Sequence, residues 1–165
     1  MFGFFGHSRR PPDIRRIGPQ SAQACAQIHA QSFAYSWTAT DFEALLAARD
    51  IVGEAALATA WPGKSPGLAG FILSRQVLDE AEILTIAVAP EFRRKGIGSA
   101  LLGVHLATLA AQGAKALFLE VEAGNQAALA LYAQFDFRQI GARNAYYRKA
   151  DGPPAAALVL RRDFG

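Results

Sequence analysis

The chain contains one cysteine, Cys25, and no long hydrophobic run among its 165 residues. A single cysteine excludes an internal disulfide framework and is typical of a reducing compartment, which predicts a cytoplasmic location. A membrane-spanning helix needs roughly 20 consecutive apolar residues, and no segment reaches that length. The apolar residues 1–6 are too few for a signal peptide and follow no basic region, so we expect no membrane partner.

The chain also has little excess of one charge and no long cluster of basic residues. The formal net charge is +3, and no run of Lys and Arg exceeds three residues. This mild excess is typical of a protein surface and predicts no direct nucleic-acid binding. The histidines His7, His29 and His105 show no ligand spacing, so we expect no metal. His105 falls on an apolar helix face, which favours a core histidine, and the surroundings of Cys25 favour a packed core thiol.

Apolar residues are plentiful, at 52%, and the length suits a single domain with its own core. We expect a flexible leader over residues 1–12 and one domain over residues 13–165. Hydrophobic periodicity predicts strands near residues 14–17, 51–60, 68–77, 81–88, 116–122, 137–143 and 155–161. It predicts helices over residues 19–33, 98–112 and 125–134, and one more that Thr40 caps and that places Phe42, Leu45 and Leu46 on one face.

This order of elements predicts an α/β fold of the α+β kind. We expect a mixed, mostly antiparallel sheet of about seven strands, flanked by about four helices. The strands on either side of the helix at residues 98–112 should pair in parallel through a right-handed crossover.

A basic loop with two glycines joins a predicted strand to a predicted helix. It follows the apolar residues 83–88 and contains Arg93, Arg94, Lys95, Gly96 and Gly98. Glycines let successive N–H groups turn toward one point, and a helix start adds unpaired donors and a positive dipole end. The order favours a phosphate site, although an ordinary basic surface turn has the same composition. The spacing Arg-x-x-Gly-x-Gly differs from both common phosphate loops.

Two carboxylates follow on the next predicted strand. Alternation places Glu120 and Glu122 on one face, with Leu119 and Val121 on the other. A carboxylate on an apolar strand is costly to bury without a partner, so the pair indicates either a functional site or the solvent face of an edge strand.

A helix that begins at Asn125 places three residues on one face. Ala128 and Tyr132 follow Asn125 at intervals that a helix brings together. Asn125 is a good N-cap and needs no further role. From the spacing alone, Tyr132 is as consistent with a buried core tyrosine as with a catalytic one.

The Arg-x-x-Gly-x-Gly loop matches the pyrophosphate loop of the Gcn5-related N-acetyltransferases. Residues 77–88, 119–121, 125–132 and 143–147 add to this match. Together they closely resemble the RimI-type ribosomal-protein-alanine N-acetyltransferases, over about residues 28–160. The resemblance implies acetyl-CoA as co-substrate and no metal. It is specific in the C-terminal half and weaker around residues 33–37.

The resemblance also implies a role for each matching residue. Glu120 would be the general base and Tyr132 the general acid. Asn125 would contact the cofactor arm near its thiol end. The backbone of Ile86, Ala87 and Val88 would pair with the pantetheine arm. The pyrophosphate would bind to Arg94, Lys95, Gly96, Ile97, Gly98 and Ser99. On the acceptor side, the expected residues are Glu122, Arg143, Tyr146 and Tyr147, the last two in a loop over the acceptor peptide.

Three positions depart from the family pattern. Ser36 stands where the family usually has Pro, and Asp136 stands where it has Gly. Glu122 replaces an Arg, which makes the entrance to the expected acceptor site more negative.

The expected function is therefore N-alpha-acetylation of the N-terminal alanine of a ribosomal protein, small-subunit protein eighteen by resemblance. We expect a monomer or weak dimer. One alternative is acetylation of other protein N-termini or of a small-molecule amine. Another is a non-catalytic acetyl-CoA-binding module, which would require neither Glu120 nor Tyr132.

Overall fold

The computed structural model describes residues 11–58, 63, 67–147 and 155–165, and only the backbone for 145–147 and 155. Most of the predicted leader therefore lies outside the described residues. In chain order, the described elements are β1 (Ile14–Arg16), the 3-10 helix η1 (Pro19–Ser21), α1 (Ala22–Ser32), α2 (Ala39–Ala47), β2 (Ile51–Leu57), β3 (Leu68–Val77), β4 (Glu80–Val88), the 3-10 helix η3 (Pro90–Phe92), α3 (Ile97–Ala111), β5 (Ala116–Glu122), α4 (Gln126–Gln134), β6 (Arg138–Tyr147) and β7 (Ala155–Asp163).

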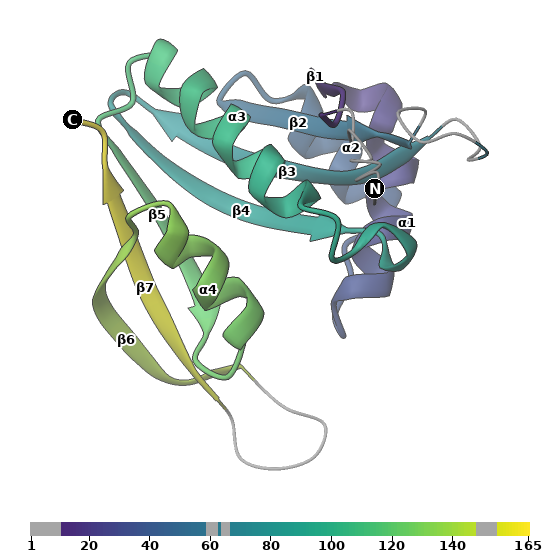
Figure 1. Ribbon diagram of the computed structural model, residues 1–165. Helices are drawn as coiled ribbons and strands as arrows, with labels where there is room; N and C mark the ends of the chain where they lie inside the picture. Colours follow the sequence, from purple (N-terminus) through teal and green to yellow (C-terminus); the bar gives the residue numbers. More distant parts are fainter. Residues whose placement is uncertain (1–10, 59–62, 64–66, 148–154) are drawn as a thin grey trace, which may run out of the picture.

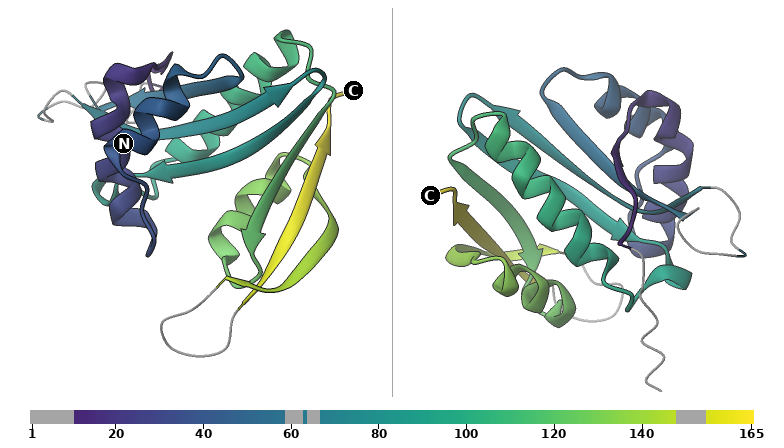
Figure 2. Two further views of the ribbon diagram at one scale, coloured as in Figure 1. Left: turned by 180° about the vertical axis from the view of Figure 1, so that it is seen from behind. Right: turned by 45° about the horizontal axis from the view of Figure 1, so that its top comes forward.

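The strands form one sheet in the order β1-β2-β3-β4-β5-β7-β6. Neighbours are antiparallel except for β4 and β5, which are parallel across the α3 crossover. Helices α3 and α4 cover one face, and α1 and α2 cover the other (Figures 1 and 2). The predicted mixed, mostly antiparallel sheet with four flanking helices is confirmed.

The sheet divides between β4 and β5. These strands pair only from Glu80 to Glu82 on β4, with 116–118 on β5, and then diverge. The register of β3 against β4 skips Leu84, which forms a bulge where the separation begins. Because a bulge bends its strand, β4 turns away from β5. Within the described residues, the rest of β4 has a strand partner on the β3 side only.

A buried polar network crosses the core from β2 to α3. The His105 ring is fully buried, with Nδ1 2.8 Å from Glu54 Oε1 and Nε2 2.7 Å from Ser74 Oγ. Thr108 donates its hydroxyl to the second Glu54 oxygen at 3.0 Å. Every polar atom of the ring thus has a partner, as a buried polar group requires. The expectation of a core histidine is confirmed.

Cys25 is fully buried on α1, and burial raises the pKa of its thiol to about 12. A thiol that stays protonated is a poor nucleophile, which agrees with the predicted core role.

The start of α2 differs from the sequence prediction. Thr38, rather than Thr40, is the N-cap. Its hydroxyl accepts the Asp41 N–H at 3.1 Å, and the Asp41 carboxylate accepts the Thr38 N–H at 2.8 Å. This reciprocal capping box satisfies two free donors at once. The hydrogen bonds from Thr38 also lower the pKa of Asp41.

The turn before β6 shows how Asp136 replaces the family's glycine. Asp136 adopts φ +63°, the left-handed conformation that glycine adopts most easily. Aspartate tolerates this region better than most residues, so the turn keeps a glycine-like backbone. Gly113 also has a positive φ, +89°, and ends α3 as predicted.

Candidate active site

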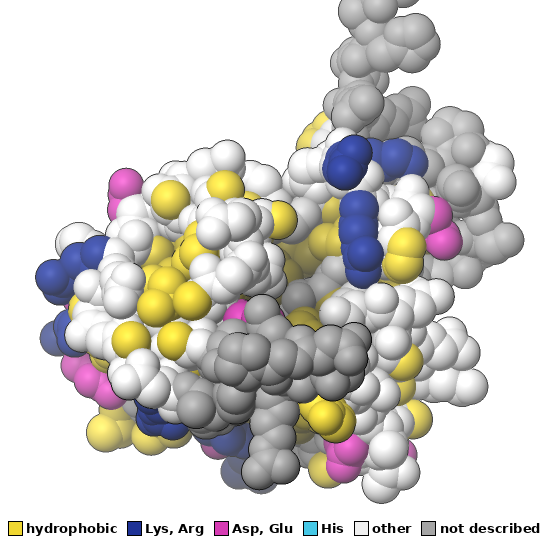
Figure 3. All heavy atoms as spheres, turned by 90° about the horizontal axis from the view of Figure 1, so that it is seen from below, with side chains coloured by type: hydrophobic (Ala, Val, Ile, Leu, Met, Phe, Trp, Pro, Cys, Tyr) yellow, Lys and Arg dark blue, Asp and Glu magenta, His cyan; other side chains and the backbone are white. Residues whose placement is uncertain are grey.

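A cavity of about 680 Å³ lies where the two halves of the sheet separate. Figure 3 shows it from below as a hollow with hydrophobic side chains inside and Lys and Arg side chains along one rim. Residues from four parts of the chain line it: His29, Phe33 and Trp37 near the end of α1, residues 82–86 of β4, residues 119–122 of β5, and Asn125, Ala128 and Tyr132 around α4.

The two predicted carboxylates of β5 both line this cavity. Glu120 is only partly exposed, and its Oε1 lies 3.3 Å from Arg143 Nε. Arg143 is on β6, two strands away, and reaches across β7 to make this contact. The contact places a positive charge beside the carboxylate that resembles the family's base. Arg143 therefore compensates the charge of a cavity carboxylate, while its predicted place on the acceptor side stays a prediction.

The α4 residues take the predicted arrangement. Asn125 caps the helix, because its Oδ1 accepts the Ala128 N–H at 3.1 Å. Tyr132 lies two turns further on the same cavity wall and is only 5% exposed. Its ring packs edge-on against Phe137, with the centroids 5.4 Å apart. The hydroxyl is thus carried on a ring that packing holds in one orientation.

The basic loop leads directly into α3. Gly96 is the N-cap with φ +77°, and no side chain caps the helix. The first N–H groups of a helix have no partner inside it, so those of Ile97, Gly98 and Ser99 are available as donors. A Cβ built on Gly96 meets nothing within 4 Å. The open space, free donors and helix dipole together suit an anion.

The three cations of the loop have different surroundings. Arg93 ties the loop to the body of the protein, since its Nε donates to the Val88 carbonyl at 3.1 Å and its Nη2 to Ser32 Oγ at 3.2 Å. Lys95 donates to the Glu91 carbonyl at 3.1 Å. Arg94 is exposed and makes no hydrogen bond or ion pair with the described residues. It is the cation best placed to meet a ligand from solvent.

Two predicted acceptor-side residues, Tyr146 and Tyr147, lie at the end of β6, where Tyr147 pairs with Ala155. Their side chains lie outside what the structure describes. Ile86, Ala87 and Val88 lie on β4 beyond the segment that pairs with β5. A ligand that binds like a strand would need an edge of this kind, with no described strand beside it.

Three cavity residues were not predicted from the sequence. Glu82, on β4, adds a third carboxylate to the lining. The Thr85 hydroxyl is buried and has no hydrogen-bond partner among the described residues. His29 is 3% exposed and stacks on Trp37. No motif marks these residues, because their place in the cavity wall depends on how α1 and β4 meet in the folded chain.

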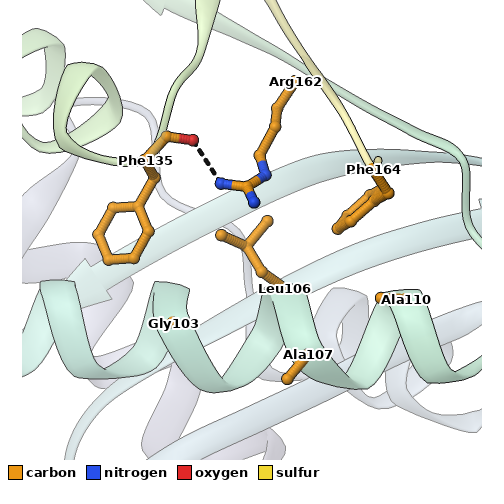
Figure 4. A pocket seen from close by; sticks show the side chains of 7 residues that line it. All are labelled: Gly103, Leu106, Ala107, Ala110, Phe135, Arg162 and Phe164. Carbon is orange, nitrogen blue, oxygen red and sulfur yellow. Dashed lines mark hydrogen bonds between the residues drawn. The ribbon is translucent and has the colours of Figure 1, made fainter.

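A second, shallower groove of about 350 Å³ lies between α3 and the C-terminal ends of α4 and β7 (Figure 4). Arg162 of β7 donates from Nη1 to the Phe135 carbonyl at 2.6 Å there. Phe135 is the C-cap of α4, so the guanidinium meets the negative end of that helix. This contact holds α4, and with it Tyr132, against the sheet.

In the described part of the chain, no group of three or more potential ligands could hold a metal ion. Searched over the same residues, no helix combines the length and the apolar character that crossing a membrane requires.

The sequence is similar to two curated bacterial enzymes. It is 36% identical to "N-alpha-acetyltransferase RimI" of Mycobacterium tuberculosis over 160 residues, 94% of each chain. It is 40% identical to the "[Ribosomal protein bS18]-alanine N-acetyltransferase" of Escherichia coli over 92 residues, 56% of this chain. The matched segment spans 62% of the length of that E. coli enzyme.

The fold is similar to solved structures as well. The crystal structure of the E. coli ribosomal-protein-S18-alanine N-acetyltransferase superposes with a TM-score of 0.82 at 29% identity, covering 92% of each chain. Arabidopsis thaliana NAA60 in complex with acetyl-CoA gives 0.81 at 24% identity, covering 92% of this chain and 97% of that one. The model of the acetyltransferase (GNAT) family matches residues 22–137. The chain therefore belongs to the GNAT family of acetyltransferases.

Proposed function

We propose that this protein is an N-alpha-acetyltransferase that transfers an acetyl group from acetyl-CoA to the N-terminal alanine of a ribosomal protein. One observation carries the proposal: Glu120 and Tyr132 line the same cavity, at the point where β4 leaves β5. The similarity to enzymes named for N-alpha-acetylation and for bS18-alanine acetylation supports the choice of acceptor.

The chain's residues suit acetyl-CoA. The free edge of β4 offers backbone groups to the amides of a pantetheine arm, and Asn125 lies on the cavity wall that faces it. The N-terminus of α3 and the loop from Arg94 to Ser99 would hold the pyrophosphate. When bound, acetyl-CoA supplies the activated acetyl group as a thioester.

Acceptor activation is assigned to Glu120. An amine attacks only when neutral, and an α-amine has a pKa near ~7.7–8.0, so its proton is loosely held at neutral pH. Glu120 would take that proton directly or through a water. The adjacent Arg143, whose Nε lies 3.3 Å from Glu120 Oε1, would orient the carboxylate. Glu122, Tyr146 and Tyr147 would contact the acceptor peptide.

Two further groups would assist the transfer. A backbone N–H near Val88 would stabilise the negative charge on the acetyl oxygen. Tyr132 would donate its hydroxyl proton to the departing thiolate. The rigid placement of its ring against Phe137 favours this role, because a general acid acts only within hydrogen-bond reach.

The proposal is tested by incubating the protein and acetyl-CoA with a panel of peptides and amines and measuring the masses of the products. We expect a gain of one acetyl group on peptides with a free N-terminal Ala. Peptides with a blocked N-terminus serve as the control and should not react. If small amines react faster than every peptide, the protein is a small-molecule acetyltransferase instead.

Acetylation of other protein N-termini is the second candidate. The M. tuberculosis relative, which aligns over 94% of both chains, is named for N-alpha-acetylation without a stated acceptor. Replacing Ala at the first peptide position by Ser, Gly or Met decides between the two. Comparable rates on all four would favour the broader activity.

Changing Glu122 to Arg is expected to weaken the selection of basic acceptors. Three carboxylates, Glu82, Glu120 and Glu122, line the cavity, so a peptide with Lys or Arg after its N-terminal Ala should be preferred. We expect Glu122→Arg to reduce the ratio of kcat/KM for basic over neutral Ala-peptides by about two- to fivefold, the range of exposed charge pairs.

The matched control for this variant is Glu80→Arg, which changes the net charge equally but lies at the closed end of β4. It should leave the ratio unchanged. Added salt should reduce the wild-type ratio, because charges are screened over roughly 8 Å at physiological ionic strength. Equal rates on basic and acidic Ala-peptides in the wild type would contradict this account of the cavity.

A further inference from the structure

His29 sits at the end of α1 in a wall of the cavity and is 3% exposed. Aromatic rings surround it: Trp37 is stacked at 4.8 Å, Phe33 lies at 4.4 Å and Phe42 at 5.4 Å between ring centroids. A histidine packed this closely among apolar rings has little water around it. Burial accordingly lowers its pKa below the ordinary value.

One hydrogen bond connects this ring to the segment between α1 and α2. The Trp37 N–H donates to His29 Nδ1 at 3.1 Å. Residues 34–37 make no other backbone hydrogen bond with the described residues. The segment is exposed, with Tyr35 77% exposed and Phe33 42% exposed, yet Phe33, Tyr35 and Trp37 line the cavity. Apart from the Phe33 N–H, which donates to the His29 carbonyl at 3.0 Å, segment 33–37 is therefore held against the cavity by this bond and by the contacts of Phe33 and Trp37 with neighbouring rings.

The bond also fixes the protonation state of the ring. An imidazole nitrogen accepts an N–H only when it has no proton of its own, so the proton of neutral His29 is on Nε2. Nε2 makes no hydrogen bond with any described residue. A second proton would place Nδ1–H against the Trp37 N–H, so two donors would oppose each other.

We propose that neutral His29 is a positioning residue that holds segment 33–37 against the cavity for acceptor binding, and that protonating His29 releases the segment. The inference rests on the proposed function for its consequence in acetylation, but the release itself can be measured without any substrate.

The direction of the pH effect follows from burial. The folded state disfavours charged His29, so the anchored segment is fully stable above the ordinary histidine pKa and loses stability as the pH falls through the lowered value. The other titratable side chains that line the cavity with His29 are Tyr35 after α1, Glu82 on β4, Glu120 and Glu122 on β5, and Tyr132 on α4. On α1 and the elements near it, Cys25 lies one turn before His29, Asp41 is in the first turn of α2, and Arg93 bonds to Ser32.

Two substitutions separate the hydrogen bond from the titration. His29→Phe keeps an aromatic ring for stacking but removes the acceptor. His29→Asn keeps an acceptor, since Asn Oδ1 is attached to Cγ as Nδ1 is, but cannot be protonated in this range. Because the partly buried Trp37 N–H would lose its partner, we expect His29→Phe to raise KM for an Ala-peptide about tenfold at pH 8. The affinity for acetyl-CoA should not change in either variant.

The pH profile gives the readout that a purely structural role would not produce. Between about pH 8 and pH 5, the wild-type KM for the peptide should rise more steeply than that of His29→Asn. Protonation of the acceptor amine affects both enzymes equally, so it cancels in their ratio. A ratio that stays constant over this range would overturn the proposal.

Fluorescence tests the release without catalysis. The chain has two tryptophans, Trp37 and Trp61, so Trp61→Phe leaves Trp37 as the only one. Acrylamide quenching of Trp37 should increase as the pH falls in this background, and should not change with pH when His29→Asn is added. Quenching that is independent of pH in the Trp61→Phe protein refutes the release. If release is seen but no peptide is acetylated, the proposed function fails and the switch stands.

Discussion

Replacing Tyr132 by Phe is expected to lower turnover by about 10²–10⁴-fold, the usual loss when a general acid is removed. The substitution deletes only the hydroxyl, and the ring keeps its edge-on contact with Phe137 at 5.4 Å. The variant should therefore fold normally and bind acetyl-CoA with unchanged affinity. Steady-state kinetics with an Ala-peptide, together with calorimetric titration of the cofactor, measures both quantities.

The size of the loss, and whether it falls on kcat or on KM, identify the role of Tyr132. A fall in kcat with little change in KM is the mark of an interaction made only in the transition state. Thermal unfolding of the variant provides the control for packing, because Tyr132 is 5% exposed. Wild-type turnover in a normally folded Tyr132→Phe protein would make this residue part of the core and leave the departing thiolate without an assigned acid.

Replacing Gly96 by Val is expected to weaken acetyl-CoA binding by at least about tenfold. Gly96 has φ +77°, and a left-handed backbone costs an L-residue roughly 1–2 kcal/mol, more for a β-branched one. The loop would shift to relieve this strain, and the new side chain would enter the open space in front of the α3 N-terminus. Calorimetry with acetyl-CoA measures the loss directly.

Gly113→Val is the matched control. Gly113 has φ +89°, a Cβ built on it also meets nothing within 4 Å, and it lies at the opposite end of the same helix. Its substitution should cause a similar backbone strain and a similar drop in stability. Cofactor affinity should nevertheless remain at the wild-type level. Equal weakening in both variants would show that Gly96 acts through helix stability rather than through contact with the pyrophosphate.

Much of the fold is predictable because it depends on short-range patterns. The bounds of β3 and β5 agree with the prediction, and Gly113 follows the end of α3 as expected. The alternating or helical spacing of apolar residues shows which face of a segment is buried, and this spacing is contained in that segment alone. The predicted cap of α2, Thr40, was wrong: Thr38 and Thr40 are each followed three residues later by an acid, and the structure forms the capping box of Thr38 with Asp41.

The candidate site was only partly predictable. The glycine loop and the Asn125, Ala128 and Tyr132 spacing are local signals, so sequence indicates them directly. The pairing of Arg143 with Glu120 joins strands that are separated by β7. The position of His29 beside Trp37 requires the chain to turn back on α1 directly after that helix ends. No spacing along the chain predicts either contact.

By itself, the sequence determined the strand and helix pattern and the family of the protein, and it predicts a phosphate site in the loop at Gly96. Those properties depend on backbone freedom, periodicity and residues close together in the chain. Only the tertiary structure decided which polar groups share the cavity. The bulge at Leu84 and the short β4–β5 pairing open the sheet there. That opening brings His29, Glu120 and Tyr132 to one cavity, because long-range strand pairing sets their positions.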